Sequence, residues 1–371
     1  MIVNDKLLIQ THRLLTCAHC SASWFLMRKF SLLFSTAMVV LAVVAYAGWA
    51  RHRTVTHYLS DLRIDLVQEQ GVRGEGGNVL GIQPRMTPAD YQDARRLRLK
   101  FEAYLRQARV QGLLGPHTVV VLPEHIGTWL WLSGEKDEVY QADRLDAASG
   151  WLTLSNPLAF IQAWWQGEGK HRLSEAQLRM KASRMRDDFQ WVFGGLARQF
   201  QVTLVAGSIV LPNPSAQDGQ LALGAGPLYN VGVVFGPDGR VLGQPLRQHQ
   251  VHYRRFLSQG PSPAVAFIST PGGPLAVAVG DDAWAPAVQA RTREQGARAL
   301  LVPAFSARAL NESSPPPGPD LSTRSPAGVL VYLRGRFWSH VGTGEGYSWQ
   351  AGRHGQSAPA GDGAGMFNLW L

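Results

Sequence analysis

The sequence predicts an α/β domain that is preceded by one apolar helix. Two observations support this prediction. Short apolar segments typical of strands alternate with segments of helical periodicity from about residue 77 onwards, and residues 30–50 contain no charged side chain. Strands that alternate with helices indicate the α/β class, and residues 77–371 are within the size range of one large domain.

The composition excludes several classes of protein. Hydrophobic residues make up 45% of the 371 residues and charged residues 17%, which is typical of a folded chain and not of a disordered one. The net charge of +9 comes from scattered arginines without a run of five like charges, so we expect no nucleic-acid partner. Only six of the 36 basic residues are lysines, and none follows Lys181. The two cysteines, Cys17 and Cys20, both precede the apolar stretch.

Residues 30–50 are predicted to form a transmembrane anchor. A helix of this length is about 31 Å long, which matches the hydrocarbon core of a bilayer. Arg28 and Lys29 precede the stretch, and Arg51 and Arg53 follow it. We therefore expect a single-pass protein with an N-terminal tail at residues 1–29.

An alternative for the same segment is a cleaved signal peptide. It would start at Met27 and be cut after Ala45-Tyr46-Ala47, which has the small–x–small pattern of a cleavage site. An uncleaved anchor is favoured because the apolar region is longer than the hydrophobic region of a signal peptide, which has roughly 7–15 residues. Residues 1–29 and 51–76 each carry four Lys or Arg, so charge does not settle the orientation, and we expect the main domain outside the cytoplasm.

The elements of the main domain follow from local patterns. Residues 51–76 are predicted to be a connector that is helical up to Gln70 and then broken by glycines. Thr87, Pro88 and Asp90 have the pattern of a helix start, and apolar residues then recur at helical spacing. The apolar face of this first helix is Leu97, Phe101, Tyr104 and Ala108, and the face of a second helix, at the end of a Trp-rich insert, is Phe189, Phe193, Leu196 and Phe200.

The predicted strands are short apolar runs bounded by turn residues. They cover residues 78–83, 118–122, 202–206, 228–235, 275–279 and 299–302, with a helix at 285–295 between the last two. Residues 311–326 are rich in Pro and Ser and are predicted to be a loop. Two further strands are expected at 329–337 and 366–371, around a Gly-rich linker.

Glu124 is the first candidate site residue. It follows the buried-type strand 118–122, and open α/β sheets place their ligands at the carboxyl ends of strands. A carboxylate there can act as a general base. The sequence alone also allows a capping or surface role for this residue.

Several segments, taken in order, resemble the nitrilase, or carbon–nitrogen hydrolase, superfamily. They are a strand that ends at Gln83, a strand that ends in Pro123-Glu124, a strand–turn–strand unit around 230–249, an apolar strand with its continuation at 275–286, and the segment QGARALLVP at 295–303. The resemblance extends from about residue 78 to 305. It implies a four-layer α-β-β-α sandwich, a homodimer, and a cysteine thiolate that attacks an amide or nitrile carbon. A glutamate takes the thiol proton, and a lysine stabilises the developing negative charge.

The resemblance implies that the catalytic residues are mostly lost. Glu124 matches the general base, but the cysteine position falls on Gly280, and the lysine position falls on Arg247 or Gln248. Glycine has no nucleophile and a glutamine side chain is neutral, whereas an arginine would remain a cation. We therefore predict a pseudoenzyme with a binding or scaffold role, and we expect no cofactor and no metal.

Two alternatives remain open at this stage. Asp281 and Asp282 adjoin the missing thiol, so an altered hydrolase of amide C–N bonds that uses these carboxylates is one of them. The other is an N-acyltransferase-like activity near the membrane, which the anchor and a similarity to apolipoprotein N-acyltransferase suggest. In each case the expected ligand is a small amide-like or acyl compound. Cys17 and Cys20 form a C-x-x-C pair without the second ligand pair that structural zinc needs.

Overall fold

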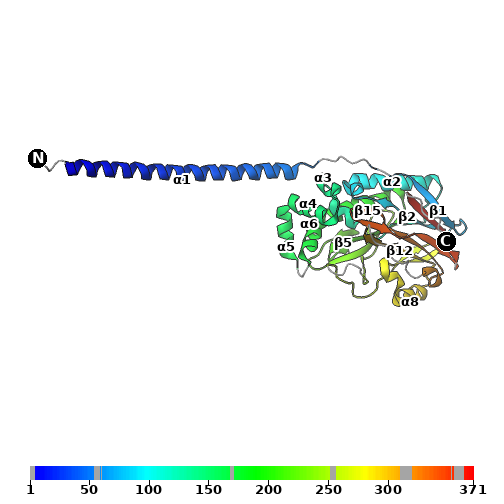
Figure 1. Cartoon of the computed structure of the whole chain (residues 1–371). Coiled ribbons are helices and arrows are strands. Elements are labelled where there is room, and N and C mark those ends of the chain that lie inside the picture. Colours follow the sequence, from blue (N-terminus) through cyan, green and yellow to red (C-terminus); the bar gives the residue numbers. More distant parts are fainter. Residues whose placement is uncertain are drawn as a thin grey trace. The chain divides into compact units, whose positions relative to one another are not determined.

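The chain divides into two compact units, Met1–Arg53 and Thr54–Leu371. The computed structural model describes residues 5–53, 59, 61–167, 171–250, 256–309, 320–351, 353–354 and 363–371, and of residues 5–26 the backbone only. The first unit is one long helix, and the second contains every described strand (Figure 1).

The helix of the first unit is α1, Asp5–Arg51. Within it, the 25 residues Met27–Arg51 are long and apolar enough to cross a membrane, and an 18-residue window in this stretch has a mean hydropathy of 2.2. Their large apolar side chains are exposed, and Phe30 for example is 75% exposed. The stretch predicted at residues 30–50 is therefore helical. Cys17 and Cys20 belong to the part of α1 whose side chains lie outside the described residues.

The second unit contains two large sheets whose central strands are parallel. β2, β4 and β5 are parallel neighbours in the first sheet, as are β11, β12 and β14 in the second. In spatial order, the first sheet consists of β1 (Ile64–Gln70), β19 (Ala364–Trp370), β2 (Asn78–Gln83), β4 (Thr118–Val121), β5 (Thr203–Pro212), β8 (Leu228–Phe235) and β9 (Leu246–Arg247). The second consists of β10 (Ala266–Thr270), β11 (Gly273–Val277), β12 (Ala299–Ala304), β14 (Ala327–Tyr332), β17 (Tyr347–Gln350) and β18 (Arg353–His354).

Two smaller sheets complete the described strands. One is formed by β13 (Ser306–Ala309), β16 (His340–Thr343), β15 (Arg334–Phe337) and β3 (Arg85–Met86), and the other by the hairpin of β6 (Ser215–Gln217) and β7 (Gln220–Ala222).

The two large sheets pack face to face because their strands are apolar on both sides. Successive side chains of a strand point to opposite faces. In β4, Val119 and Val121 join the core between the sheets, whereas Val120 joins the core beneath the helices. Gly81 of β2 allows the sheets to approach closely, since a Cβ there would lie 2.5 Å from a methyl carbon of Val329.

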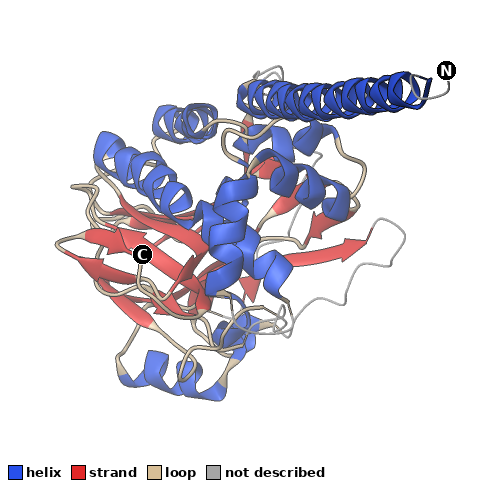
Figure 2. Cartoon of the chain, turned by 90° about the vertical axis from the view of Figure 1, so that its left-hand side faces the viewer, coloured by secondary structure: helices blue, strands red, loops and turns tan. Residues whose placement is uncertain are grey.

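Helices cover the outer faces of both sheets (Figure 2). α2 (Ala94–Val110), α6 (Arg172–Phe189) and α7 (Gly195–Phe200), the last two joined by a π-helical segment at Gln190–Gly194, share a core with the first sheet. α8 (Pro286–Glu294) shares a core with the second sheet. The four layers α-β-β-α predicted from the sequence are thus confirmed. The remaining helices are α3 (Asp137–Gln141), α4 (Leu145–Ser155), α5 (Pro157–Gln166) and the 3-10 turns Pro88–Tyr91, Thr128–Leu132, Gly280–Trp284 and Leu321–Thr323.

Both predicted helix faces are buried, as amphipathic periodicity requires. The helix expected from Thr87 starts differently. Asp90 accepts hydrogen bonds from the backbone N–H and the hydroxyl of Thr87, and this closes a 3-10 turn. α2 itself begins at Ala94, where the carboxylate of Asp93 caps the N–H of Arg95.

The helix predicted in the connector up to Gln70 is wrong at residues 64–70. Ile64–Gln70 is the strand β1, which pairs in parallel with β19 almost 300 residues later in the chain. The buried carboxamide of Gln68 also exchanges two hydrogen bonds with the backbone of Ser348. The globular unit therefore begins before residue 77, and pairing partners this distant leave no local signal in the sequence.

The Gly-rich linker expected before the last strand is also wrong. β16 and β17 lie within it, and Trp349 of β17 is fully buried. Its indole packs against Gly328 of β14, where a Cβ would lie within 2.5 Å of the ring. Gly328 thus makes room for the tryptophan. Most of the loop predicted at 311–326 lies outside the described residues.

Candidate functional site

Glu124 lies in a tight turn directly after β4. The backbone of β5 holds this turn, because the N–H of Leu122 donates to Val205 and the N–H of Gly127 to Ser208. The hydroxyl of Ser208 also accepts the N–H of His125, at 2.7 Å. Ser208 reaches the turn because β5 is irregular between Val205 and Ser208. The turn places the Glu124 side chain in the interior, 4% exposed.

Asn230 of β8 connects Glu124 to Gln248. Its Nδ2 donates to a carboxylate oxygen of Glu124 at 2.9 Å and to Oε1 of Gln248 at 2.7 Å. Asn230 is fully buried, and Gln248 is 4% exposed. The site therefore has a buried acid and two buried carboxamides that three separate segments supply. The sequence reasoning missed Asn230, although a polar residue inside the apolar run 228–235 was a usable signal.

Gly280 lies against two of these side chains, Glu124 and Gln248. It begins the 3-10 turn after β11 and has a φ of +52°, in the left-handed region that favours glycine. A Cβ on this residue would lie 2.8 and 2.9 Å from the carboxylate oxygens of Glu124, and closer still to Nε2 of Gln248. The carboxamide of Gln248 thus fills the space that a side chain at position 280 would need.

Arg247 and Gln248 point in different directions, as neighbours along a strand do. The Arg247 guanidinium donates to Oδ1 of Asn213 at 2.9 Å and lies 4.5 Å from the ring centre of Tyr229. Gln248 is therefore the one of the two that meets Gly280 and Glu124.

The carboxylate of Asp282 accepts hydrogen bonds from the backbone. It is 1% exposed, and it accepts hydrogen bonds from the N–H groups of His249, Gln250 and Ala264. These bonds hold the segment after β9 against the turn that contains Gly280. Asp281 is partly exposed in the same turn.

Tyr332, at the end of β14, also belongs to this region. Burial raises the pKa of its phenol to about 12, with smaller contributions from Tyr347 and from the negative charges of Asp281 and Glu124. Its backbone N–H donates to the carboxamide of Gln83, which ends β2. Nothing in the sequence pattern singled out Tyr332.

The described residues offer no metal site. Within them, no three His, Cys, Asp or Glu side chains gather closely enough to hold an ion. A cavity of about 180 Å³ does lie in the second unit, but at the amino ends of β2 and β4, next to Asn78 and Thr118. Glu124 follows the carboxyl end of β4, so this cavity is separate from the site.

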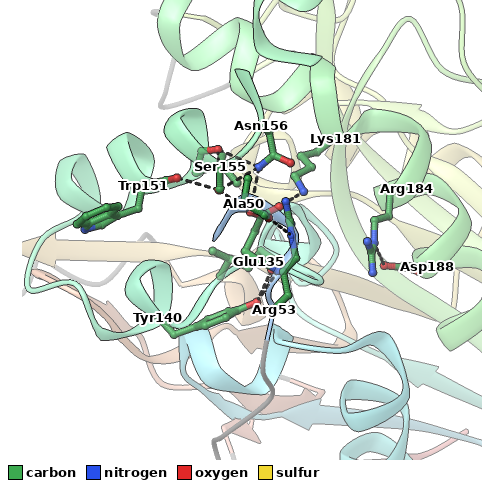
Figure 3. A network of polar contacts seen from close by, with 12 residues as sticks. Ala50, Arg53, Glu135, Tyr140, Trp151, Ser155, Asn156, Lys181, Arg184 and Asp188 are labelled. Atoms are coloured by element: carbon green, nitrogen blue, oxygen red, sulfur yellow. Dashed lines mark hydrogen bonds and ion pairs between the residues drawn. The ribbon is translucent and has the colours of Figure 1, made fainter. Parts of the chain in front are cut away.

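A second buried polar cluster lies in the Trp-rich insert (Figure 3). Glu135 forms an ion pair with Lys181 of α6 and accepts hydrogen bonds from Ser155 and Asn156 at the end of α4. The ammonium of Lys181, the last lysine in the chain, is thus used to join α6 to the loop that contains Glu135. This cluster stabilises the insert.

Comparison with solved structures shows which known fold this chain resembles. The chain is similar to the amidase from Nesterenkonia sp. AN1, of which one structure has acrylamide added to the active-site cysteine. That structure is 16% identical, has a TM-score of 0.51, and the match covers 80% of this chain and 93% of the amidase. A cysteine-to-serine mutant of the same amidase, from the nitrilase superfamily, is 17% identical with a TM-score of 0.51, and the match covers 81% and 93%. No protein-family model and no curated protein matches the sequence.

Proposed function

We propose that this chain is a membrane-anchored pseudoenzyme with the fold of nitrilase-superfamily amidases and a binding or scaffold role. One observation carries the proposal: the carboxamide of Gln248 fills the space beside Gly280, next to Glu124. The general-base position of the resemblance is kept, while the nucleophile position has no side chain. A small amide-like or acyl compound is the ligand class to which the resemblance points.

The chemistry of amide cleavage explains why these two positions matter. A covalent route needs a nucleophile that an adjacent base activates, and a charge or donor that stabilises the developing oxyanion. Glycine supplies no nucleophile, and the glutamine carboxamide supplies no positive charge. Loss of a nucleophile lowers the rate by several orders of magnitude.

The carboxylates next to Gly280 are a poor replacement for the thiol. Asp282 already accepts three backbone N–H groups, so recruitment to catalysis would release the segment after β9. An altered hydrolase would therefore depend on Asp281 together with Glu124.

The anchor in this proposal is the apolar part of α1. Met27–Arg51 is long enough to span the hydrocarbon core, and basic residues flank it on both sides. The second unit, which holds the site, would then lie outside the cytoplasm, tethered to the bilayer.

Hydrolysis is the direct test of this proposal. The full chain in detergent is incubated with a panel of short amides, nitriles and esters, and product release is measured beside the Glu124→Ala variant. We expect the wild type to release no more product than the variant. Turnover by the wild type that is lost in Glu124→Ala would overturn the proposal, and Asp281→Asn would then identify the replacement nucleophile.

A further inference from the structure

Helix α5 (Pro157–Gln166) carries apolar side chains on its exposed face. Its sequence PLAFIQAWWQ contains no charged residue. Leu158 and Trp165 are each 82% exposed and Ile161 is 52% exposed, and their spacing of three and four residues puts them on one face. Surface helices of globular proteins normally carry polar and charged residues outward.

The inward side of α5 is already packed. Ala163 is 4% exposed, and the helix packs against α6. Phe160 and Trp164 are half-buried and contact each other at 5.7 Å between ring centres. The exposed residues Leu158, Ile161 and Trp165, here called the α5 face, are therefore additional to the core and not needed for it. Figure 1 shows α5 at the periphery of the second unit.

We propose that the α5 face docks on the surface of the lipid bilayer in which this chain is anchored. The proposal rests on the membrane anchor of the proposed function. Twelve residues, 52–63, lie between the end of the span at Arg51 and the first strand residue Ile64, and even fully extended this segment spans at most about 45 Å. This reach is about twice the radius of gyration of roughly 20 Å expected for a unit of this size, so the surface of the second unit stays close to lipid headgroups.

The chemistry of the α5 face suits that surface. Interfacial helices bury their apolar side roughly 5–10 Å into the boundary between headgroups and acyl chains, and tryptophan is favoured at that depth. His171 and Arg172, a few residues beyond Trp165 at the start of α6, are exposed, as is the neighbouring Leu173. Basic side chains beside an apolar face favour anionic headgroups.

A second copy of the chain is the rival occupant. A stable protein interface buries about 800 Å² on each partner, and three side chains of a ten-residue helix supply only part of such an area. A bilayer surface requires no complementary shape. The lipid surface is thus the occupant that both the small apolar area and the short tether favour.

The test measures the depth of α5 in a reconstituted bilayer. The full chain, with Cys17→Ser and Cys20→Ser, is inserted into vesicles of phosphatidylcholine and phosphatidylglycerol and labelled at Leu158→Cys with the environment-sensitive dye nitrobenzoxadiazole. Val110→Cys, at the 88% exposed end of α2, is the matched control. We expect the dye at residue 158 to emit at shorter wavelength and to be quenched by spin-labelled lipid. The dye at residue 110 should be quenched by aqueous iodide instead.

Each other outcome overturns the inference. A dye at residue 158 that behaves like the dye at 110 means that the α5 face stays in water. A dye shielded from both lipid and aqueous quenchers assigns the face to a protein contact. Adding Ile161→Glu and Trp165→Glu should abolish lipid quenching at residue 158 if the face itself docks.

Alkaline carbonate extraction of the same vesicles separates this inference from the anchor. Release of the chain contradicts the membrane anchor and with it the docking. Retention of the chain together with a water-exposed residue 158 overturns the docking alone.

Discussion

Two residues of the site differ from those that the resemblance implies, and their atoms fit each other. Gly280 removes a side chain, and the carboxamide of Gln248 takes up the space. The side-chain amide of Asn230 donates hydrogen bonds to both Glu124 and Gln248. A buried acid without such a donor would be costly, so the network explains how Glu124 remains buried.

Asn230→Ala should destabilise the second unit by about 1–3 kcal/mol, because two buried acceptors lose the donor that they share. Denaturant unfolding of the full chain in detergent measures this change. Gln199→Ala is the matched control, since Gln199 also donates to a glutamate, at 2.9 Å, but on the exposed surface. Its cost should stay within about 0.5 kcal/mol. Equal effects of the two substitutions would show that the Asn230 network contributes nothing to stability.

Tyr332 makes the stability depend on pH at the alkaline end. Its pKa is raised by burial to about 12 in the fold, whereas a tyrosine in the unfolded chain has a pKa of about 10. The unfolded chain therefore loses this proton first, and the stabilisation present below about pH 10 is lost as the pH rises toward about 12. We expect Tyr332→Phe to make the fall of the unfolding free energy over this range less steep. An unchanged slope, measured by denaturant titrations at several pH values, would contradict the raised pKa.

Elements with strong local patterns were predictable, and those defined by distant partners were not. The strand at 228–235 and the buried faces of α2 and of α6–α7 follow from the apolar periodicity of the sequence alone. In β1, polar residues occupy most of the exposed positions, and the strand is defined by its pairing with β19. The position of β17 is defined by the space at Gly328. In the same way, the position of Glu124 after a strand was predictable, whereas the contact of Gln248 with Gly280 depends on how two sheets face each other.

The pairing of β1 gives a prediction about the domain boundary. A chain that begins at residue 59 should fold, because β1 can still cover the edge of β19. A chain that begins at residue 77 exposes that edge and removes the hydrogen bonds of Gln68 to Ser348, so it should aggregate or unfold. Circular dichroism and gel filtration of the two truncated chains test this. Equal folding of both would show that β1 is dispensable.

At the scale of the whole molecule, the fold is similar to that of the solved amidases, and helix α1 contains a stretch that is long and apolar enough to span a membrane. The α-β-β-α layers position Glu124 from one sheet against Gly280 from the other. In the pseudoenzyme that we propose, this fold is kept, whereas the cysteine and the lysine that the resemblance implies are replaced. Homodimerisation and the location outside the cytoplasm stay predictions.

The measurement that tests this account most directly is a double-mutant cycle on the unfolding free energy of the full chain. Gly280→Ala adds a methyl group against Gln248 and Glu124 at a φ of +52° and should cost several kcal/mol, about 1–3 from overpacking and about 1–2 from the left-handed backbone. Gly296→Ala is the control, because its φ is +59° but no atom lies within 4 Å of the new methyl group. In a Gln248→Ala background, Gly280→Ala should cost less by about 0.5–3 kcal/mol, while the cost of Gly296→Ala should stay the same. If Gly280→Ala costs no more than Gly296→Ala and shows no coupling to Gln248, then Gln248 does not fill the place of the nucleophile and the account fails.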